Sequence, residues 1–310
     1  MSKSYTLYTR SNFDGIVCAS LLKELGLIDD VVFVHPKDIQ DGKIKMTDED
    51  ITASLPYTEG VYMAFDHHSS EMVRNKVVPD NYIIEPAAPS SSRIIYEYFG
   101  GKSKFSDNLN NLMELVDNAD CNILTSEDII NPQGWVLLNY LMDPRTGLGR
   151  FNYFRISNYH LMLKLVDLFI DKTMDEIMQD EDVIERIELY KKEQPLFIEQ
   201  IKKCTKTDGN IAIVDIHNEE KIHAGNRFMV YALFPECNIS IHYINGKKNQ
   251  NISFAVGKSI LNRTCPIDIG AMLYEFGGGG HINAGTCQVD YDKAEETLKK
   301  IINKIKELNK

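Results

Sequence analysis

The first third of the chain alternates between short runs of strand-forming residues and helical patterns. Such alternation is typical of a parallel α/β sheet. Ligands of these sheets bind beyond the carboxyl ends of the strands. The pattern predicts strands at residues 5–9, 31–35 and 61–65 and helices at 16–25 and 90–99.

The pattern becomes mainly helical from about Leu109 to Thr205. Within it, residues 171–203 are highly charged and carry apolar residues at helical spacing, which predicts a connector helix with one solvated face. Strands and helices return after Asn210. They are predicted as strands at residues 211–216, 228–233, 239–243, 252–256 and 286–289, and as helices at 267–275 and 292–308.

These patterns predict an α/β protein of three parts. Residues 1–150 form an N-terminal domain with a parallel sheet, and residues 151–208 form a helical connector. Residues 209–310 form a smaller C-terminal α/β domain. Domains of this size can build their own hydrophobic cores.

Composition narrows the range of partners. Of the 310 residues, 43% are hydrophobic and 25% are charged, which is ordinary for a soluble globular protein. The net charge of −11 argues against a protein that coats long duplex nucleic acid through a basic face. A small anionic substrate is still compatible, because bound divalent cations reverse the local sign of a carboxylate cluster.

The cysteines and the N-terminal segment indicate a compartment. Six cysteines are scattered without a CxxC pair, which favours a reducing, cytoplasmic location. The first residues lack the apolar core of a signal peptide, and no apolar run reaches the roughly 18 residues of a membrane span. Neither secretion nor membrane insertion is expected.

Asp66, His67 and His68 directly follow a predicted strand. A carboxylate and adjacent imidazoles at one strand end suit a divalent cation. Oxygen and nitrogen ligands favour Mn²⁺, with Mg²⁺ or Co²⁺ as alternatives, over metals that prefer thiolates. Taken alone, the tripeptide is a weak signal, since paired histidines also occur on ordinary surfaces.

Asn12, Phe13, Asp14 and Gly15 follow the first predicted strand. Glycine permits a sharp turn, and the N-terminus of the next helix favours anions, so Asp14 could face a ligand there. The alternative is that Asp14 caps that helix.

Asp117 and Asp120 are three residues apart, which places both on one face of a predicted helix. Either carboxylate could reach a metal. The alternative is that they cap the helix or belong to a solvated face.

Four consecutive glycines precede His281 in the C-terminal third. The backbone N–H groups of such a run can surround phosphate oxygens, and His281 can add a donor. Arg145 and Arg150 lie in a turn-rich segment and could bind phosphate with paired donors. Surface salt bridges are an equally good interpretation of these two arginines.

Together these motifs resemble the DHH phosphoesterase superfamily with its DHH-associated C-terminal domain, over nearly the whole chain. Exopolyphosphatase-related proteins and oligoribonuclease-like enzymes of that superfamily are similar. The resemblance implies an active site in a cleft between the two domains, with two divalent cations, usually Mn²⁺. It is carried by residues 12–15, 66–68, Asp117, Asp120, Asn262, Arg263, Asp268, 277–281, Ala284 and Gly285.

The resemblance also implies roles for individual residues. His68 should contact the metal shell or the substrate phosphate, and Asp14 should act in catalysis. The metal ligands should be Asp14, Asp66, His67 and Asp120, with Asn12 at an altered ligand position and Asp117 as the alternative to Asp120. The substrate-binding residues should be Gly278, Gly279, Gly280, His281, Arg263 and Asn262, with Arg150 as a further candidate.

The first two motifs depart from the family pattern. Arg10 stands where the family usually has histidine, and Asn12 stands where it has aspartate. A neutral amide is a poor ligand for a hard divalent cation, so one metal site could be weakened or lost. The second-motif aspartate is not evident near residues 54–56, and Asp38, Asp41 and Asp50 are distant candidates for it.

The leading functional hypothesis is a metal-dependent hydrolase of phosphodiester bonds in short oligonucleotides or nucleotide-like small molecules. One alternative is an exopolyphosphatase that acts on inorganic polyphosphate. Another is a non-catalytic nucleotide or phosphate sensor, suggested by Arg10 and Asn12. The expected partner is a small phosphorylated substrate or a short single strand, without long duplexes or membranes, and a homodimer is compatible with this hypothesis.

Overall fold

The computed structural model describes residues 4–68, 71–72, 77–246 and 250–309. The chain divides into two compact units. The first contains residues 1–123 and 132–190, and the second contains residues 124–131 and 191–310.

The first unit is built on a five-stranded sheet in which every pair of neighbouring strands is parallel. The strand order is β2-β1-β3-β4-β5. The predicted parallel α/β sheet is therefore confirmed. Its strands are β1 (Tyr5–Thr9), β2 (Ile28–Phe33), β3 (Asp50–Ala53), β4 (Met63–Asp66) and β5 (Tyr82–Ile84).

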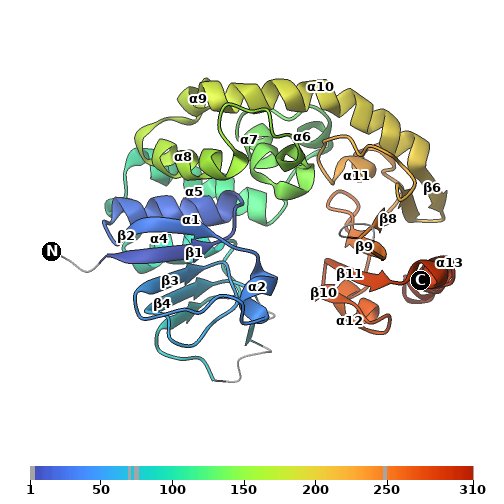
Figure 1. Ribbon diagram of the computed structural model, residues 1–310, viewed down its shortest axis with the longest axis horizontal. Coiled ribbons are helices and arrows are strands. Elements are labelled where there is room, and N and C mark those ends of the chain that lie inside the picture. Colours follow the sequence, from blue (N-terminus) through green and yellow to red (C-terminus); the bar gives the residue numbers. More distant parts are fainter. Residues whose placement is uncertain (1–3, 69–70, 73–76, 247–249, 310) are drawn as a thin grey trace. The chain divides into compact units, whose positions relative to one another are not determined.

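Helix α1 (Phe13–Glu24) is enclosed by the rest of the first unit. Every residue from Phe13 to Leu22 is buried. Helix α1 contacts β1 and β2 and also three further helices (Figure 1). These are α4 (Ser91–Tyr98), α5 (Asp107–Asp120) and α8 (Asn158–Asp171). A helix that is apolar all round is stable only when it is buried in this way.

The middle of the chain is helical, as the pattern predicts. A small helix, α2 (Pro36–Gln40), follows β2 in the first unit. The further helices are α6 (Ser126–Ile130), α7 (Gly134–Met142), α9 (Met174–Ile177) and α10 (Glu181–Cys204), with 3₁₀ turns at 101–103, 144–146 and 148–150. Helix α10 contributes residues to both units, while α6 belongs to the second.

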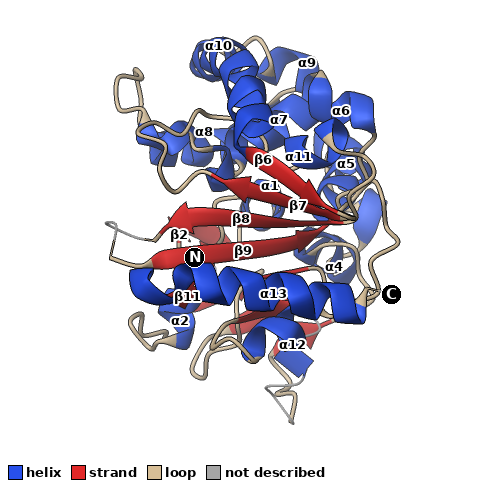
Figure 2. Ribbon diagram, turned by 90° about the vertical axis from the view of Figure 1, so that its right-hand side faces the viewer, coloured by secondary structure: helices blue, strands red, loops and turns tan. Residues whose placement is uncertain are grey.

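The second unit contains a six-stranded mixed sheet in the order β10-β11-β9-β8-β7-β6. Strands β7 and β8 are parallel, and the other neighbours are antiparallel. Helices α12 (Ile269–Tyr274) and α13 (Ala294–Leu308) cover one face of it (Figure 2). The strands are β6 (Thr205–Asp208), β7 (Ile211–Asp215), β8 (Ile239–Asn245), β9 (Ile252–Lys258), β10 (Gly279–His281) and β11 (Ala284–Val289).

One predicted strand of this unit is wrong. Residues 228–233 are predicted as a strand, but the structure has helix α11 (Met229–Leu233) there. The connection between the parallel strands β7 and β8 must cross over the sheet, and α11 is part of that crossover. Met229 and Val230 are buried, and a short buried helix has no solvated face that would distinguish its pattern from that of a buried strand.

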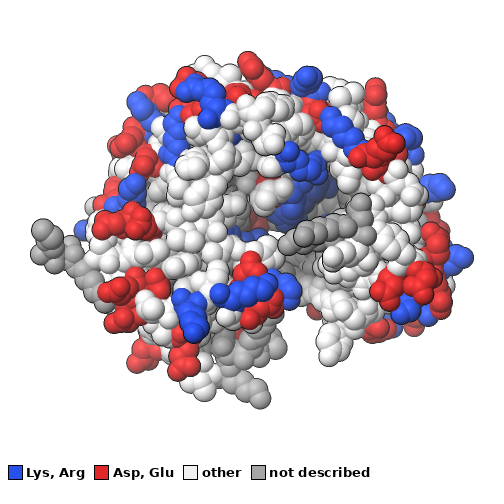
Figure 3. Space-filling model, in the orientation of Figure 1, with Lys and Arg blue, Asp and Glu red and all other residues white. Residues whose placement is uncertain are grey.

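Two further features bear on partners. Acidic and basic side chains lie interspersed along the helical part of the first unit on the face drawn in Figure 3. Among the described ranges, no helix combines the length and apolar character needed to cross a bilayer.

Candidate active site

The sheet of the first unit has a topological switch point beside β1. From β1 the chain goes first to β2 on one side and later to β3 on the other. In open α/β sheets, the strand ends at such a point form a crevice where ligands bind. Asn12 and Asp14 follow β1, Ser54 follows β3, and Asp66 ends β4. These side chains therefore start from neighbouring strand ends.

The start of α1 is capped by Asn12. Its Oδ1 accepts a hydrogen bond from Gly15 N at 3.1 Å, so Asn12, rather than Asp14, is the N-cap. Gly15 lies within the helix, where a Cβ atom would be 2.0 Å from the carbonyl oxygen of Arg10. Close packing of α1 against the preceding segment thus requires this glycine. The sharp turn predicted from sequence is not the reason for it.

Asp14 is almost fully buried in the first turn of α1, with 1% of its surface exposed. Its Oδ1 accepts a hydrogen bond from Ser92 N, at the N-terminus of α4, at 2.8 Å. Its Oδ2 is buried and has no hydrogen-bond partner among the described residues. A buried carboxylate oxygen without a partner is costly, and a bound cation would remove that cost.

Asp14, His67 and Asp120 converge from three different elements. Each offers one ligand atom, and these atoms all lie within 4.8 Å of one another. His67 Nε2 is 3.2 Å from Asp120 Oδ2. Two carboxylates and one imidazole form a donor set that suits Mn²⁺ or a similar divalent cation. The residues present therefore fit a cation at this position.

The electrostatics of Asp120 agree with this fit. Burial and the nearby Asp14 carboxylate raise the pKa of Asp120 to about 6. Two carboxylates close together in a partly desolvated site disfavour the charged form of each other. A divalent cation would reverse this penalty and hold both in the charged form.

Asp66 is fully buried and orients its neighbours. Its Oδ1 accepts a hydrogen bond from His67 N at 2.9 Å and lies 2.6 Å from His68 Nδ1. Its Oδ2 accepts a hydrogen bond from Tyr82 at 3.3 Å. Burial alone would lower the pKa of His68, but the hydrogen bond and charge of Asp66 outweigh it and raise that pKa. Asp66 therefore holds His67 and His68 in place beside the cluster.

Asp117, the alternative to Asp120, is engaged elsewhere. Its Oδ1 accepts a hydrogen bond from Ser90 at 2.6 Å. Its Oδ2 accepts two from Arg93, at 2.9 and 2.6 Å. The structure thus brings Asp120 into the cluster, while Asp117 fixes the start of α4.

The start of α4 supplies contacts that sequence reasoning missed. Ser90 caps the helix by accepting from Arg93 N at 3.0 Å, and Asp117 holds both of these residues. This arrangement directs Ser92 N at Asp14. A serine followed by a helical pattern signals a cap. Nothing local in the sequence reveals that the capped helix end points at Asp14.

The region of the second motif holds Ser54, immediately after β3. Ser54 is buried, its N donates to Phe65 O at 2.9 Å, and its φ of 57° lies in the left-handed region. Non-glycine residues in that region cluster at functional sites. The acidic candidates have other partners: Asp38 and Asp41 pair with Lys43, and Asp50 accepts from Thr47.

The glycine run of the second unit lies partly in a hairpin. Gly279, Gly280 and His281 form β10, which pairs with β11. A Cβ at Gly278 would lie 2.3 Å from Thr286 O, and a Cβ at Gly270 in α12 would lie 2.5 Å from Gly280 O. These glycines allow backbone to pack on backbone. His281 is exposed at the end of β10.

The other predicted substrate-binding residues lie in loops. The Asn262 side chain donates to the carbonyl oxygens of Pro235 and Glu236. Arg263 is exposed, and its Nε donates to Ile260 O at 2.9 Å. Arg150 is exposed in the first unit, and its guanidinium lies against Gly147. Arg145 forms the ion pair with Asp143 that a surface interpretation predicts.

Comparison with known proteins identifies the family. No protein-family model and no curated protein sequence matches the chain. Among solved structures, the pGpG-specific phosphodiesterase PggH from Vibrio cholerae is 47% identical, covering 98% of this chain and 100% of that chain, with a TM-score of 0.84. RecJ from Thermus thermophilus in complex with Mn²⁺ is 14% identical, covering 98% of this chain and 52% of that one, with a TM-score of 0.55, and shows the fold alone.

The identity to PggH extends over nearly the whole length of both chains. Two of the segments that carry the sequence resemblance, residues 12–15 and 66–68, lie at strand ends of the parallel sheet. The chain therefore belongs to the DHH phosphoesterase family.

Proposed function

We propose that this protein is a phosphodiesterase that hydrolyses a short linear dinucleotide such as pGpG to mononucleotides. The observation that carries the proposal is the 47% identity to a pGpG-specific phosphodiesterase over 98% of the chain. The cluster of Asp14, His67 and Asp120 supports it, because cleavage of a phosphodiester bond needs a centre that stabilises charge on phosphoryl oxygens.

The proposed cofactor is a divalent cation, with Mn²⁺ as the favoured ion. When bound, such a cation supplies Lewis acidity for the phosphoryl group and lowers the pKa of water. Asp14, His67 and Asp120 would hold it, and the buried Oδ2 of Asp14 supports the presence of a cation there. Asp66 would act indirectly, by orienting His67 and His68.

His68 is the proposed contact to the substrate phosphate. Its Nδ1 faces Asp66, so the imidazole is held in one orientation. Because Asp66 raises its pKa, His68 keeps its proton to higher pH and can donate it to a phosphoryl oxygen. In the overall reaction, water adds an oxygen to phosphorus, the phosphodiester bond breaks, and two mononucleotides leave.

The parts of the substrate distant from the phosphate need further contacts. We propose that these come from the segment from Gly278 to His281, together with Asn262, Arg263 and Arg150. Exposed His281, Arg263 and Arg150 offer donors for phosphate or base edges. The free cysteines, four of which are buried, support the proposal of a reducing, cytoplasmic compartment.

The experiment is a substrate comparison. Purified protein in Mn²⁺ would receive pGpG, a linear trinucleotide or a short inorganic polyphosphate, and products would be separated by ion-exchange chromatography. We expect GMP from pGpG at a kcat/KM at least about tenfold above that for the trinucleotide, and no phosphate from polyphosphate. Hydrolysis of polyphosphate with pGpG left intact would contradict the proposal, as would binding of pGpG without turnover.

A further inference from the structure

Two ligand positions of the first motif carry side chains without negative charge. Arg10 is itself a cation, and Asn12 is neutral. The structure uses Asn12 Oδ1 as the acceptor for Gly15 N, so this oxygen already has a structural partner. Neither residue supplies a charged ligand at the end of β1.

The end of β3 is also without a carboxylate. Ser54 follows β3 in the position between the ends of β1 and β4, and its side chain is uncharged. The nearest acidic residue of that strand, Asp50, lies at its opposite end and accepts hydrogen bonds from Thr47. At the switch point, Asp14 and Asp120 thus supply negatively charged ligand atoms. Arg10, Asn12 and Ser54 supply none.

Within the part of the chain that the structure describes, His, Cys, Asp and Glu side chains form a single group of three or more with metal-ligand spacing. It consists of Asp14, His67 and Asp120. Two carboxylates and one imidazole are enough for one divalent cation that completes its shell with water and substrate. A second ion would have to share these ligands, because the oxygens of the remaining carboxylate, Asp66, are engaged by His67 N, His68 and Tyr82.

Arg10 directly follows β1, at the same strand end from which Asn12 and Asp14 start. It is close enough to interact electrostatically with both Asp120 and His68. No hydrogen bond or ion pair joins it to another of the described residues. A permanently charged, planar donor without a partner next to a phosphoryl site is suited to bind phosphoryl oxygens.

We propose that this site binds one divalent cation per chain, held by Asp14, His67 and Asp120, and that Arg10 provides the second positive charge for the phosphoryl group. The proposal rests on the proposed function for the identity of the substrate. It differs from the two ions that the family resemblance implies, and it explains why the residues at 10, 12 and 54 can all lack a negative charge.

This arrangement has a consequence that separates it from a two-cation site. Arg10 repels the cation, because both are positive, yet it attracts the phosphoryl oxygens. Replacing Arg10 by an uncharged side chain of similar length should therefore lower turnover without weakening cation binding. A residue that only supported the fold would change both in the same direction.

The test counts bound ions directly. The free Mn²⁺ signal in electron paramagnetic resonance would be measured during a titration of the full chain, followed by a spectrum of the bound ion at low temperature. We expect one ion per chain and a spectrum of isolated Mn²⁺. In Arg10→Met we expect one ion again, bound equally tightly or several-fold tighter, with kcat for pGpG reduced about 10²-fold. Arg10→Lys should recover part of that loss.

Arg155→Met is the matched control, because it removes the same side chain from an exposed ion pair with Glu181. It should change neither binding nor turnover. Two ions per chain, or a spectrum of exchange-coupled Mn²⁺, would overturn the proposal. Weaker Mn²⁺ binding in Arg10→Met, or an unchanged kcat, would overturn the role of Arg10. If the wild-type chain fails to hydrolyse pGpG, the proposed function fails, while the ion count still decides this proposal.

Discussion

At the scale of single residues, Asp117 and Asp120 show how position decides the role of a carboxylate. They occupy one face of α5, and the sequence treats them as alternatives. Asp117 meets Ser90 and Arg93, which are neutral and positive partners. Asp120 lies close to Asp14 and His67. The carboxylates of Asp120 and Asp14 repel each other unless a cation is bound between them. The two residues should therefore respond differently to the same substitution.

Asp117→Asn should lower the free energy of unfolding by roughly 1–3 kcal/mol, because Arg93 loses a charged acceptor in a partly buried contact. Its Mn²⁺ affinity should change little.

Asp120→Asn should weaken Mn²⁺ binding at least about tenfold and leave the cation-free protein no less stable, since a repelled carboxylate is removed. Denaturant unfolding and Mn²⁺ titration measure the two effects. Loss of Mn²⁺ binding in Asp117→Asn at unchanged stability would reverse the assignment.

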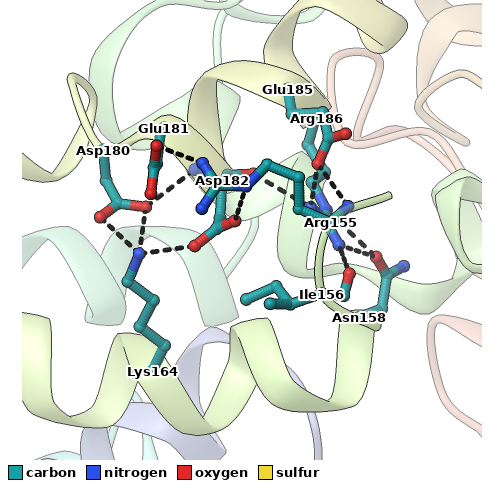
Figure 4. Close-up of polar contacts among 9 residues, drawn as sticks. All are labelled: Arg155, Ile156, Asn158, Lys164, Asp180, Glu181, Asp182, Glu185 and Arg186. Carbon is teal, nitrogen blue, oxygen red and sulfur yellow. Dashed lines mark hydrogen bonds and ion pairs between the residues drawn. The ribbon is translucent and has the colours of Figure 1, made fainter. Parts of the chain in front are cut away.

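At the scale of elements, a buried arginine joins α10 to the segment before α8. Arg186 is fully buried (Figure 4). Its guanidinium lies 3.9 Å from the centre of the Phe154 ring. It donates to the carbonyl oxygen of Ile156 and to Asn158, and it pairs with Glu185. A buried charge with this many partners orders the loop that it contacts.

Arg186→Met should cost about 3–5 kcal/mol of unfolding free energy, because it leaves the buried carbonyl oxygen of Asp182 and several partly buried acceptors without a donor. Arg155→Met, in the same network but half exposed, should cost little. Chemical denaturation of both variants makes the comparison. Equal losses of unfolding free energy in the two variants would contradict the prediction that the buried arginine contributes more than the half-exposed one.

A second contact of α10 makes a prediction about pH. Burial alone would raise the pKa of Glu193, but hydrogen bonds from His223 and Lys221 outweigh it and hold that pKa below its ordinary value. The unfolded chain therefore takes up this proton first as pH falls. The stabilising contribution is present above the ordinary glutamate pKa and is lost as pH falls through the lower, folded value.

Glu193→Gln should remove this part of the pH dependence. Unfolding midpoints measured between neutral and acidic pH should fall less steeply in the variant, although the variant is less stable at neutral pH. Glu199→Gln, a neighbouring glutamate that is exposed on the same helix, is the control and should keep the slope of the wild type. An identical slope in Glu193→Gln would contradict the prediction.

At the scale of the whole molecule, sequence patterns predict the long elements better than the short ones. The parallel sheet could be predicted because strands such as β1 and β4 lie in strand-forming runs. Polar residues come directly at or after the end of each run. Strand β3 has four residues, as β4 does, but it mixes polar and apolar residues and does not stand out as an apolar run, and β5 has only three residues. Helix α11 resembles a strand because its segment is apolar and short.

The candidate site could be predicted only in part. Asp14, His67 and Asp120 belong to motifs that the sequence displays, and the structure brings them together. The contact of Ser92 with Asp14 spans 78 positions of the chain, so no local pattern could reveal it. The ion pair between Arg93 and Asp117 is likewise set by the packing of α4 on α5.

The most direct test of the central claim is the rate of pGpG hydrolysis as a function of Mn²⁺ concentration, in the wild-type chain and in His67→Ala. The account predicts GMP release that rises with occupancy of the cation site, stops when a chelator removes Mn²⁺, and falls at least about 10²-fold in the variant. Equal turnover by wild type and His67→Ala across the titration, or full activity in excess chelator, would contradict it.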